Sequence, residues 1–102
     1  VNINKFKNKH YEKKKKFYQK IFLDSEIEYC LKFKNSSQHF AGKFAIKEAV
    51  IKSLKKEIEF LDIITEHKDS KPIVKLKMKN EYNFFVSVSH DKDYAIAIVI
   101  IQ

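Results

Sequence analysis

The run of residues 94–101 constrains the fold more than any other segment of this chain. It reads Tyr-Ala-Ile-Ala-Ile-Val-Ile-Ile and is apolar at every position after Tyr94. A strand with one wet face alternates apolar and polar residues, so this continuous apolar run predicts a central strand covered on both faces. Residues 84–89 also form a strand-like run, and the four residues 90–93 join the two, which predicts a hairpin.

Helical patterns fill the first half of the chain. Residues 7–20 are dominated by lysine with aromatic residues interleaved, which predicts a basic amphipathic helix in one or two pieces. Ser25 and Glu28 have the spacing of a capping box, so a second helix is expected from there to about Lys34. After a loop at 35–37, a long helix is expected from about Gln38 to Lys56.

Two further strands are expected at 58–65 and 73–79, joined by a turn over 66–72 that contains the only proline. In the second strand apolar residues alternate with Lys75, Lys77 and Lys79, which indicates a sheet with one wet face. Helices followed by strands predict an α+β fold, with three helices packed on an antiparallel sheet. At 102 residues, the chain is expected to form a single domain, residues 1–102.

The charge balance favours an anionic partner. Lys and Arg number 21 against 13 Asp and Glu, a net charge of +8. Such a surplus suits nucleic acid, anionic lipid, a phosphorylated ligand or an acidic protein, although codon bias in an AT-rich genome is an alternative source of lysine. The one cysteine, Cys30, is expected to be a small core residue in a reducing compartment. No run is long and apolar enough to cross a membrane, so no membrane partner is expected.

The long helix carries the most informative charges. It is apolar around most of its circumference, yet Glu48 and Lys52 project together from one sector. One reading is an ordinary ion pair between residues four apart. The other is a Mg²⁺ ligand beside a phosphate-binding lysine, because hard cations prefer carboxylate oxygen.

Histidine offers one further candidate. His90 follows a strand and begins a turn, where it could donate a hydrogen bond to an anion or could have no role. The other histidines, His10, His39 and His67, show no metal-ligand spacing, and no role is expected for them.

Taken together, these segments resemble one family. Residues 44–52, Phe-Ala-Ile-Lys-Glu-Ala-Val-Ile-Lys, resemble the F-x-x-K-E-A-x-x-K signature of phosphopantetheinyl transferases of the small holo-acyl-carrier-protein synthase type. Residues 87–95 resemble that family's closing S-[IV]-[ST]-H-x-x-x-Y-A hairpin, and residues 41–44 its A-G-R-F entry to the helix. Residues 23–30 resemble its L-T-x-x-E-L-x-Y-C segment, and Asp62-Ile63 its D-I strand.

The resemblance implies a reaction and a set of roles. The 4'-phosphopantetheine group of coenzyme A would pass to a serine of apo-acyl carrier protein, releasing 3',5'-ADP, in fatty acid biosynthesis. Mg²⁺ would be held by Glu48, and Glu48, Lys52 and His90 would be catalytic. The coenzyme A phosphates would contact Lys43, Lys47, Lys52 and His90. An acidic carrier would dock on Lys5, Lys16 and Lys20, and active sites would lie between the subunits of a homotrimer.

The chain departs from the family pattern in three places. The family begins with a strand ending G-x-D-[IL], whose Asp is the second metal ligand; Val1 matches the residue after that motif, so this Asp is expected upstream of Val1 and the first strand is expected to be missing. A G-T-G turn is replaced by Lys55-Lys56-Glu57, and a G-K-P turn reads Ser70-Lys71-Pro72. Asp91 stands where a small hydroxyl residue is usual.

Two other functions remain open. A basic RNA-binding module would explain aromatic residues among lysines, but these aromatics have helical spacing and no RNP-type strand or GXXG loop is present, so no nucleic-acid partner is expected. A carrier-binding homologue without catalysis is the second. The expected location is the cytoplasm, or a plastid-like organelle after removal of a transit segment.

Overall fold

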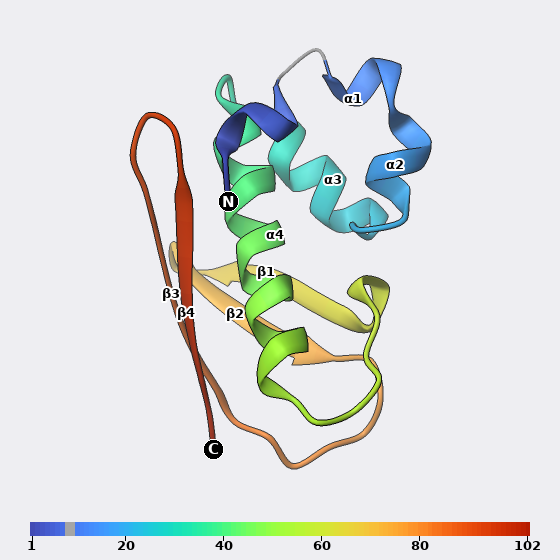
Figure 1. The fold of residues 1–102 in the computed structure, drawn as a ribbon, viewed down its shortest axis with the longest axis vertical. Helices are drawn as coiled ribbons and strands as arrows, with labels where there is room; N and C mark the ends of the chain where they lie inside the picture. The colour runs from blue at the N-terminus through green and yellow to red at the C-terminus, as the bar shows by residue number, and fades with distance from the viewer. Residues whose placement is uncertain (8–9) are drawn as a thin grey trace.

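A computed structural model describes residues 1–7 and 10–102. Helix α4 runs through the middle of the molecule, with the shorter helices on one side and the β3–β4 hairpin on another (Figure 1). The order of elements confirms the α+β class. In chain order they are the 3-10 helix η1 (Ile3–Phe6), α1 (His10–Lys13), α2 (Lys15–Gln19), α3 (Asp24–Leu31), α4 (Ser36–Ser53), the 3-10 helix η2 (Phe60–Asp62), β1 (Ile63–Lys68), β2 (Lys71–Leu76), β3 (Phe84–His90) and β4 (Ala95–Ile101).

The basic N-terminal segment forms two short helices. Lys14 separates α1 from α2 and has a non-helical backbone (φ −131°, ψ 44°). Residues 8 and 9 of the helix expected over 7–20 lie outside the described residues. Aromatic rings from this segment pack together and against α4, in a core cluster that includes Phe6, Tyr18, Phe22 and Phe40.

The starts of α3 and α4 differ from expectation. The backbone N–H of Leu23 donates to the Glu26 carboxylate at 2.8 Å, so α3 begins one residue before Ser25 and the expected Ser25–Glu28 capping box is wrong. The reason is that Glu26 is buried and faces the start of its own helix. Helix α4 begins at Ser36 and ends at Ser53, because Leu54 already has an extended backbone (φ −94°, ψ 137°).

The first hairpin is displaced along the chain. The strand expected from residue 58 begins at Ile63, because Phe60–Asp62 form a 3-10 turn in which the Asp62 carboxylate accepts from the Glu59 N–H at 3.0 Å. Asp69 and Ser70 have left-handed backbones (φ 51° and 66°), the conformation of a tight two-residue hairpin turn. Strand β2 therefore starts at Lys71, inside the expected turn, and Lys77 and Lys79 follow it.

The second hairpin is confirmed, but its last strand is not covered on both faces. Strand β4 pairs with β3 in the register Phe84↔Ile101 to His90↔Ala95. Its inner face packs on α4, whereas Ile96, Ile98 and Ile100 on the outer face are 60%, 61% and 54% exposed. For one chain alone, the expectation of a central, doubly covered strand is wrong, because no element of residues 1–7 and 10–102 covers this face.

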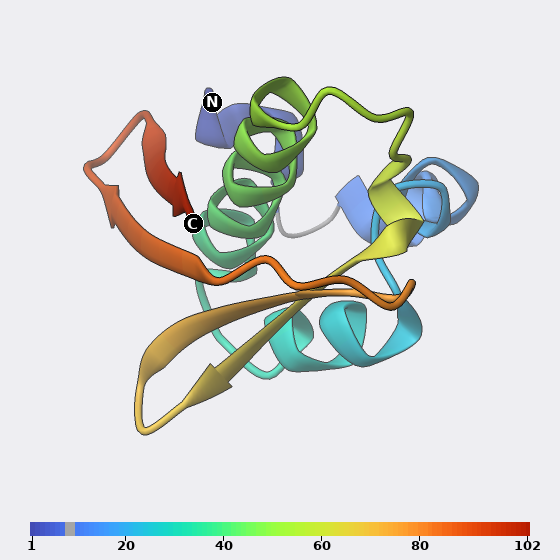
Figure 2. The ribbon, with the colours of Figure 1, turned by 90° about the horizontal axis from the view of Figure 1, so that it is seen from below.

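Helix α4 contacts both hairpins and contributes to two apolar clusters. Seen from below, the hairpins lie against neighbouring sides of it (Figure 2). The only glycine, Gly42, stands where α4 meets β3; a Cβ atom there would lie 3.3 Å from Val88 Cγ1. Among the described residues, no helix has both the length and the apolar character required to cross a membrane.

Candidate active site

Glu48 and Lys52 share one side of α4, as residues four apart in a helix do. They line a hollow of 260 Å³ in which Glu48 is half-buried and Lys52 is exposed. Among the ion pairs of the described residues, none joins Glu48 to Lys52. Both groups can therefore contact a ligand in this hollow, whose other lining residues are Val1, Ala45, Ala49, Ala95, Ile96 and Ala97.

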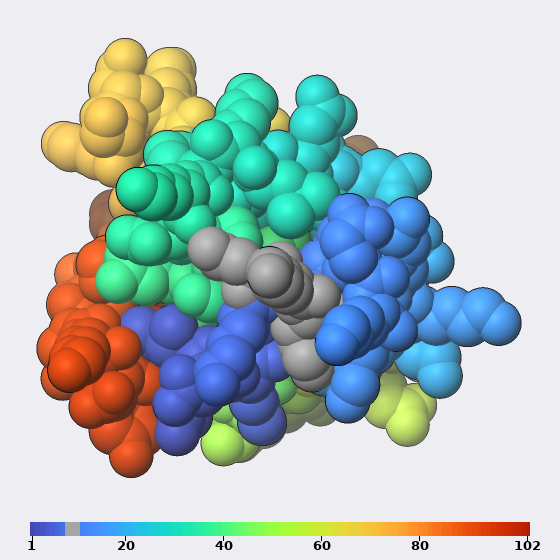
Figure 3. Space-filling view, turned by 90° about the horizontal axis from the view of Figure 1, so that it is seen from above, coloured from blue at the N-terminus to red at the C-terminus, as the bar shows by residue number. Residues whose placement is uncertain are grey.

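The first residues of the chain form one wall of this hollow. Val1 and Ala95 exchange two backbone hydrogen bonds of 2.8 Å, and the Ile3 N–H donates to the Asp93 carbonyl at 2.8 Å. Residues 1–3 thus pair antiparallel with residues 93–95, at the start of β4, and Figure 3 shows the two segments side by side. Val1 is thus held beside Glu48 by backbone pairing.

A second hollow, of 190 Å³, contains Lys43 and His90. Lys43 comes from α4 and His90 from the end of β3. The side chains of His39 and His67 also line it, so three histidines and one lysine surround a small space. Such a cluster of cationic and protonatable groups is suited to an anion.

Two histidines of this second hollow, His39 and His67, have lowered pKa values. Burial lowers the pKa of His39, and the nearby His90 and Lys43 lower it further. Burial likewise lowers the pKa of His67, together with Lys43 and His39. An anion in the hollow would oppose these shifts, because it favours the protonated imidazoles.

The two hollows face different sectors of α4. At about 100° per residue, the residues lining the first are centred roughly 100° from those lining the second. Residues of β4 complete the first hollow and residues of β3 complete the second. Glu48 and His90 of one chain therefore do not face one common space.

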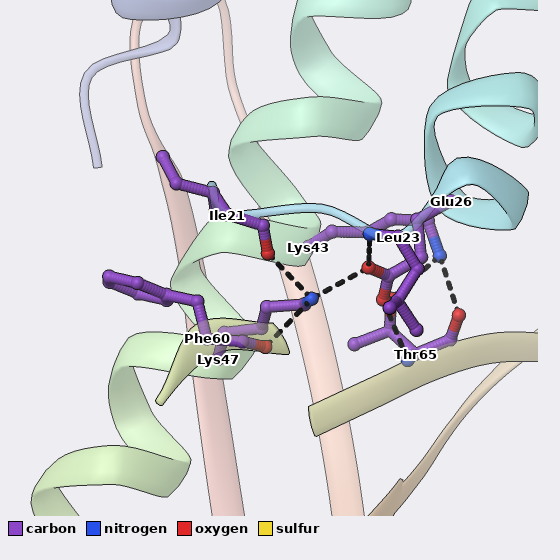
Figure 4. A network of polar contacts seen from close by, with 7 residues as sticks. All are labelled: Ile21, Leu23, Glu26, Lys43, Lys47, Phe60 and Thr65. Carbon is purple, nitrogen blue, oxygen red and sulfur yellow. Dashed lines mark hydrogen bonds and ion pairs between the residues drawn. The ribbon is translucent and has the colours of Figure 1, made fainter. Parts of the chain in front are cut away.

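A third sector of α4 faces a buried polar network (Figure 4). The Lys47 ammonium is fully buried and donates to Glu26 Oε1 at 2.6 Å, to the Ile21 carbonyl at 2.8 Å and to the Phe60 carbonyl at 3.1 Å. The other Glu26 oxygen accepts from the Thr65 N–H at 2.8 Å and from the Thr65 hydroxyl. Lys43 donates to that hydroxyl at 2.9 Å and to the Thr65 carbonyl at 3.2 Å.

Burial lowers the pKa of both lysines in this network, and attraction to Glu26 opposes the shift at each. Lys47 has no remaining donor, since an ammonium has three hydrogens and three protein oxygens accept them. The structure thus places Lys47 in the interior, away from both hollows. Lys43 differs, because it reaches the edge of the second hollow.

The residues expected to contact the carrier lie at the surface. Lys5, Lys16 and Lys20 are all exposed. Lys5 lines a hollow with Asn4, Lys14 and Phe17. The Phe17 ring is 42% exposed, so an apolar surface lies among these cations.

Several residues of these networks were not expected from the sequence. His39 and His67, for which no role was expected, join His90 because α4 and the β1–β2 hairpin meet there. Glu26 is separated from Lys47 by 21 residues, and only the resemblance of residues 23–30 to a family segment pointed to it. Asp91 caps the β3–β4 turn, because its carboxylate accepts from the N–H groups of Asp93 and Tyr94 at 2.8 Å.

Comparison with known proteins identifies the family. Residues 1–99 match the model of the 4'-phosphopantetheinyl transferase superfamily. The chain belongs to this superfamily. Its resemblance to phosphopantetheinyl transferases of the small holo-acyl-carrier-protein synthase type, drawn from residues 44–52 and 87–95, is confirmed.

Two superfamily members illustrate the similarity in sequence. A holo-[acyl-carrier-protein] synthase of Thermodesulfovibrio yellowstonii is 42% identical over 97 residues, which cover 91% of this chain and 85% of the relative. One from Mycoplasma mycoides is 36% identical over 104 residues, covering 100% of this chain and 93% of the relative.

Solved structures of the superfamily have the same fold. The holo-[acyl-carrier-protein] synthase of Helicobacter pylori, in complex with coenzyme A, aligns with a TM-score of 0.80 and 32% identity over 100% of this chain and 95% of the other. The Bacillus anthracis enzyme, in complex with coenzyme A (3',5'-ADP), aligns with a TM-score of 0.82 and 29% identity over 99% and 89% of the two chains.

Proposed function

We propose that this chain transfers the 4'-phosphopantetheine group of coenzyme A to a serine of apo-acyl carrier protein, for fatty acid biosynthesis. The observation that supports this most is the hollow in which the signature residues Glu48 and Lys52 stand together without pairing to each other. The serine oxygen would form a bond to the phosphorus nearer pantetheine, the bond to the bridging oxygen would break, and 3',5'-ADP would leave. Relatives named holo-[acyl-carrier-protein] synthase support the same reaction.

Glu48 is the proposed protein ligand of Mg²⁺. Among the described residues, no group of three or more His, Cys, Asp or Glu could hold a metal ion alone. A half-buried carboxylate fits Mg²⁺ nonetheless, because this ion is commonly held by one or two carboxylates together with phosphate oxygens. When bound, Mg²⁺ would neutralise charge on the pyrophosphate.

The backbone register supports the second ligand expected upstream of Val1. Val1 pairs with Ala95 in an antiparallel ladder, so a residue two positions before Val1 would stand opposite Ala97. Opposite residues in a ladder point to the same face of the sheet. Ala97 lines the hollow of Glu48, so an Asp at that upstream position would point into the same hollow.

The phosphate contacts divide between the two hollows. Lys52 would contact the reacting pyrophosphate beside Glu48. Lys43 and His90 would contact another phosphate of coenzyme A in the second hollow, with His39 and His67 beside it. Lys47 is not part of this proposal, because its three donors are taken by protein oxygens.

The carrier is proposed to dock on the basic N-terminal segment. Lys5, Lys16 and Lys20 would attract an acidic protein, and the exposed Phe17 ring would supply an apolar contact. The RNA-binding alternative is less well supported, because aromatic residues of this segment such as Phe6, Tyr18 and Phe22 are buried in the core and cannot stack on bases.

A homotrimer is part of the proposal. The outer face of the β3–β4 hairpin exposes Phe85, Ile96, Ile98 and Ile100, and a closed ring of subunits would bury it. Because Glu48 and His90 face different hollows, a site that uses both would be completed by a neighbouring subunit.

We also propose a cytoplasmic location, where the lone thiol of Cys30 would stay reduced.

Incubation with coenzyme A, Mg²⁺ and an apo-carrier, followed by the mass of the carrier, tests the proposal. The chain extended by Asp-Ile before Val1 should convert the carrier to a species heavier by one phosphopantetheine group. An Asn-Ile extension is the matched control and should be far slower. Binding of the carrier without any mass change, even with the Asp-Ile extension, would instead support the non-catalytic homologue.

A further inference from the structure

We propose that the buried pair of Glu26 and Lys47 sets the rotation of α4 about its axis and so positions Glu48. This inference rests on the proposed role of Glu48 in the transfer. Glu26 and Lys47 would touch neither substrate nor metal, so they are positioning residues.

Helix α4 needs such a contact because apolar burial alone defines its rotation poorly. Its buried residues are spread over most of its circumference, including Phe40, Ala41, Phe44, Ile46 and Val50. Burial of apolar surface is non-directional, so a helix without a single apolar stripe gains similar burial at several rotations. Hydrogen bonds are directional and can select one of these rotations.

Lys47 makes contacts that depend on its orientation. Its ammonium bonds to oxygens from three separate places: α3, the segment after α2, and η2 (Figure 4). The described residues include no buried side-chain nitrogen or oxygen without a partner. A rotation of α4 would leave at least one such group unpaired in the interior, which is costly.

The acceptor is itself held in place. Glu26 accepts from the N–H groups of Leu23 and Thr65, each at 2.8 Å, and from the Thr65 hydroxyl. These bonds fix the carboxylate to α3 and to β1. Through Glu26, Lys47 therefore fixes the rotation of α4 relative to α3 and β1.

Glu48 follows Lys47 in the chain, so the rotation that seats Lys47 also sets the direction of Glu48, about 100° around the helix. A reacting constellation tolerates only about 10–20° of angular error. Loss of the Lys47 contacts should therefore harm the metal ligand more than the fold.

The variant Lys47→Met keeps the length of the side chain and removes its donors. We expect kcat to fall at least about tenfold and the Mg²⁺ concentration for half-maximal transfer to rise severalfold, since a misdirected carboxylate binds the metal less well. Val74→Ala, a buried position on β2 outside the network, is the control for loss of stability and should not change the Mg²⁺ dependence. Glu26→Gln, a milder change, should shift the Mg²⁺ dependence in the same direction and replaces Lys47→Met if that variant does not fold.

A measurement independent of activity reports the rotation itself. Ala49 is half-buried and lines the hollow of Glu48, so the alkylation rate of an Ala49→Cys thiol reflects how α4 faces β4. The native Cys30 thiol is fully buried and does not compete. We expect Lys47→Met to change this rate severalfold and Val74→Ala, at matched stability, to leave it unchanged.

The inference would be overturned if the Ala49→Cys thiol were alkylated at the same rate with and without Lys47→Met. An unchanged Mg²⁺ dependence in folded Lys47→Met protein would also overturn it. These variants are built in the chain extended by Asp-Ile before Val1. Absence of transfer by that extended chain without further substitution would contradict the proposed function instead, and the alkylation rates would then be the only test of the rotation.

Discussion

Glu48 is the single residue on which the proposed chemistry depends most. Glu48→Gln keeps the size and polarity of the side chain, but an amide oxygen is a much poorer Mg²⁺ ligand than a carboxylate. We expect the variant to fold normally and to lose transfer by at least about 100-fold, because the metal supplies several kcal/mol of charge stabilisation. Circular dichroism checks the fold and the mass of the carrier checks turnover. Glu81→Gln, at an exposed position, is the control; normal turnover in Glu48→Gln would remove Glu48 from the site.

The buried thiol of Cys30 should make the stability of the protein depend on pH in the alkaline range. Burial raises the pKa of this thiol from 9.0 to about 12. The thiol of the unfolded chain ionises above pH 9.0 while that of the folded chain stays protonated. The contribution of this thiol to the free energy of unfolding is therefore fully present below pH 9.0. It is lost as pH rises towards 12, by at most about 1.4 kcal/mol per pH unit.

Cys30→Ala should therefore weaken the alkaline loss of stability. The free energy of unfolding of the variant, from urea titrations at about pH 7 and about pH 10.5, should fall less between the two than that of the native chain. Burial is the main cause that raises the pKa of Tyr18 to about 12, and Cys30 raises it further, so most of the contribution of Tyr18 remains in the variant. Parallel losses in the two proteins would mean that the Cys30 thiol is not the cause.

At the scale of elements, the N-terminal helices carry the prediction for docking. Reversing Lys5 or Lys16 to Glu should raise the KM for the carrier roughly three- to tenfold and leave that for coenzyme A nearly unchanged, because in the proposed docking the carrier, and not coenzyme A, would contact this surface. Screening acts over about 8–10 Å at physiological salt, so added salt should have the same effect. Lys77→Glu and Lys79→Glu, after β2, are matched reversals; an equal effect from them would mean that only net charge matters.

The elements also show which parts of the fold local sequence patterns can predict. The hairpin of residues 84–101 and the long helix were predictable, because alternation, apolar runs and helical spacing are local properties. The start of β1 was not, since the hydrogen bond from Glu59 to Asp62 favours a 3-10 turn where the pattern reads as a strand.

The same limit applies to the candidate site. The side of α4 shared by Glu48 and Lys52 follows from spacing, and the structure brings both into one hollow. The interior position of Lys47 does not follow from spacing, because it depends on Glu26, 21 residues earlier, and on two carbonyl groups. The apolar run of β4 did not reveal that only its inner face is covered within the chain, because apolar residues on both faces predict two covers without saying whether the same chain supplies them.

The whole molecule should be a trimer in solution. Sedimentation at micromolar concentration should show three chains, and Ile98→Lys should yield folded monomers with little activity, because a charge on the outer face of β4 cannot be buried in a ring. Ile98 is 61% exposed in the single chain, so the substitution should spare the fold of the monomer. A native protein that is active as a monomer would contradict this prediction.

Mixing two inactive proteins tests whether sites are shared between chains. Glu48→Gln and His90→Ala chains, refolded together in equal amounts, should regain about a quarter of native activity, because each interface receives an intact Glu48 and an intact His90 with a probability of one half each. Either protein refolded alone should stay inactive. No recovery in the mixture would mean that each chain uses its own Glu48 and His90.

The placement of Glu48 and His90 in separate hollows also has a genetic meaning. In a cell with two gene copies, one allele defective at Glu48 and the other defective at His90 would compensate for each other within one assembly, although neither suffices alone. Beside a normal allele, an allele defective at both positions would do more harm than one defective at a single position, since each doubly defective chain would spoil the interfaces on both of its sides. Dominance of a mutation would then depend on how many of the two hollows it damages.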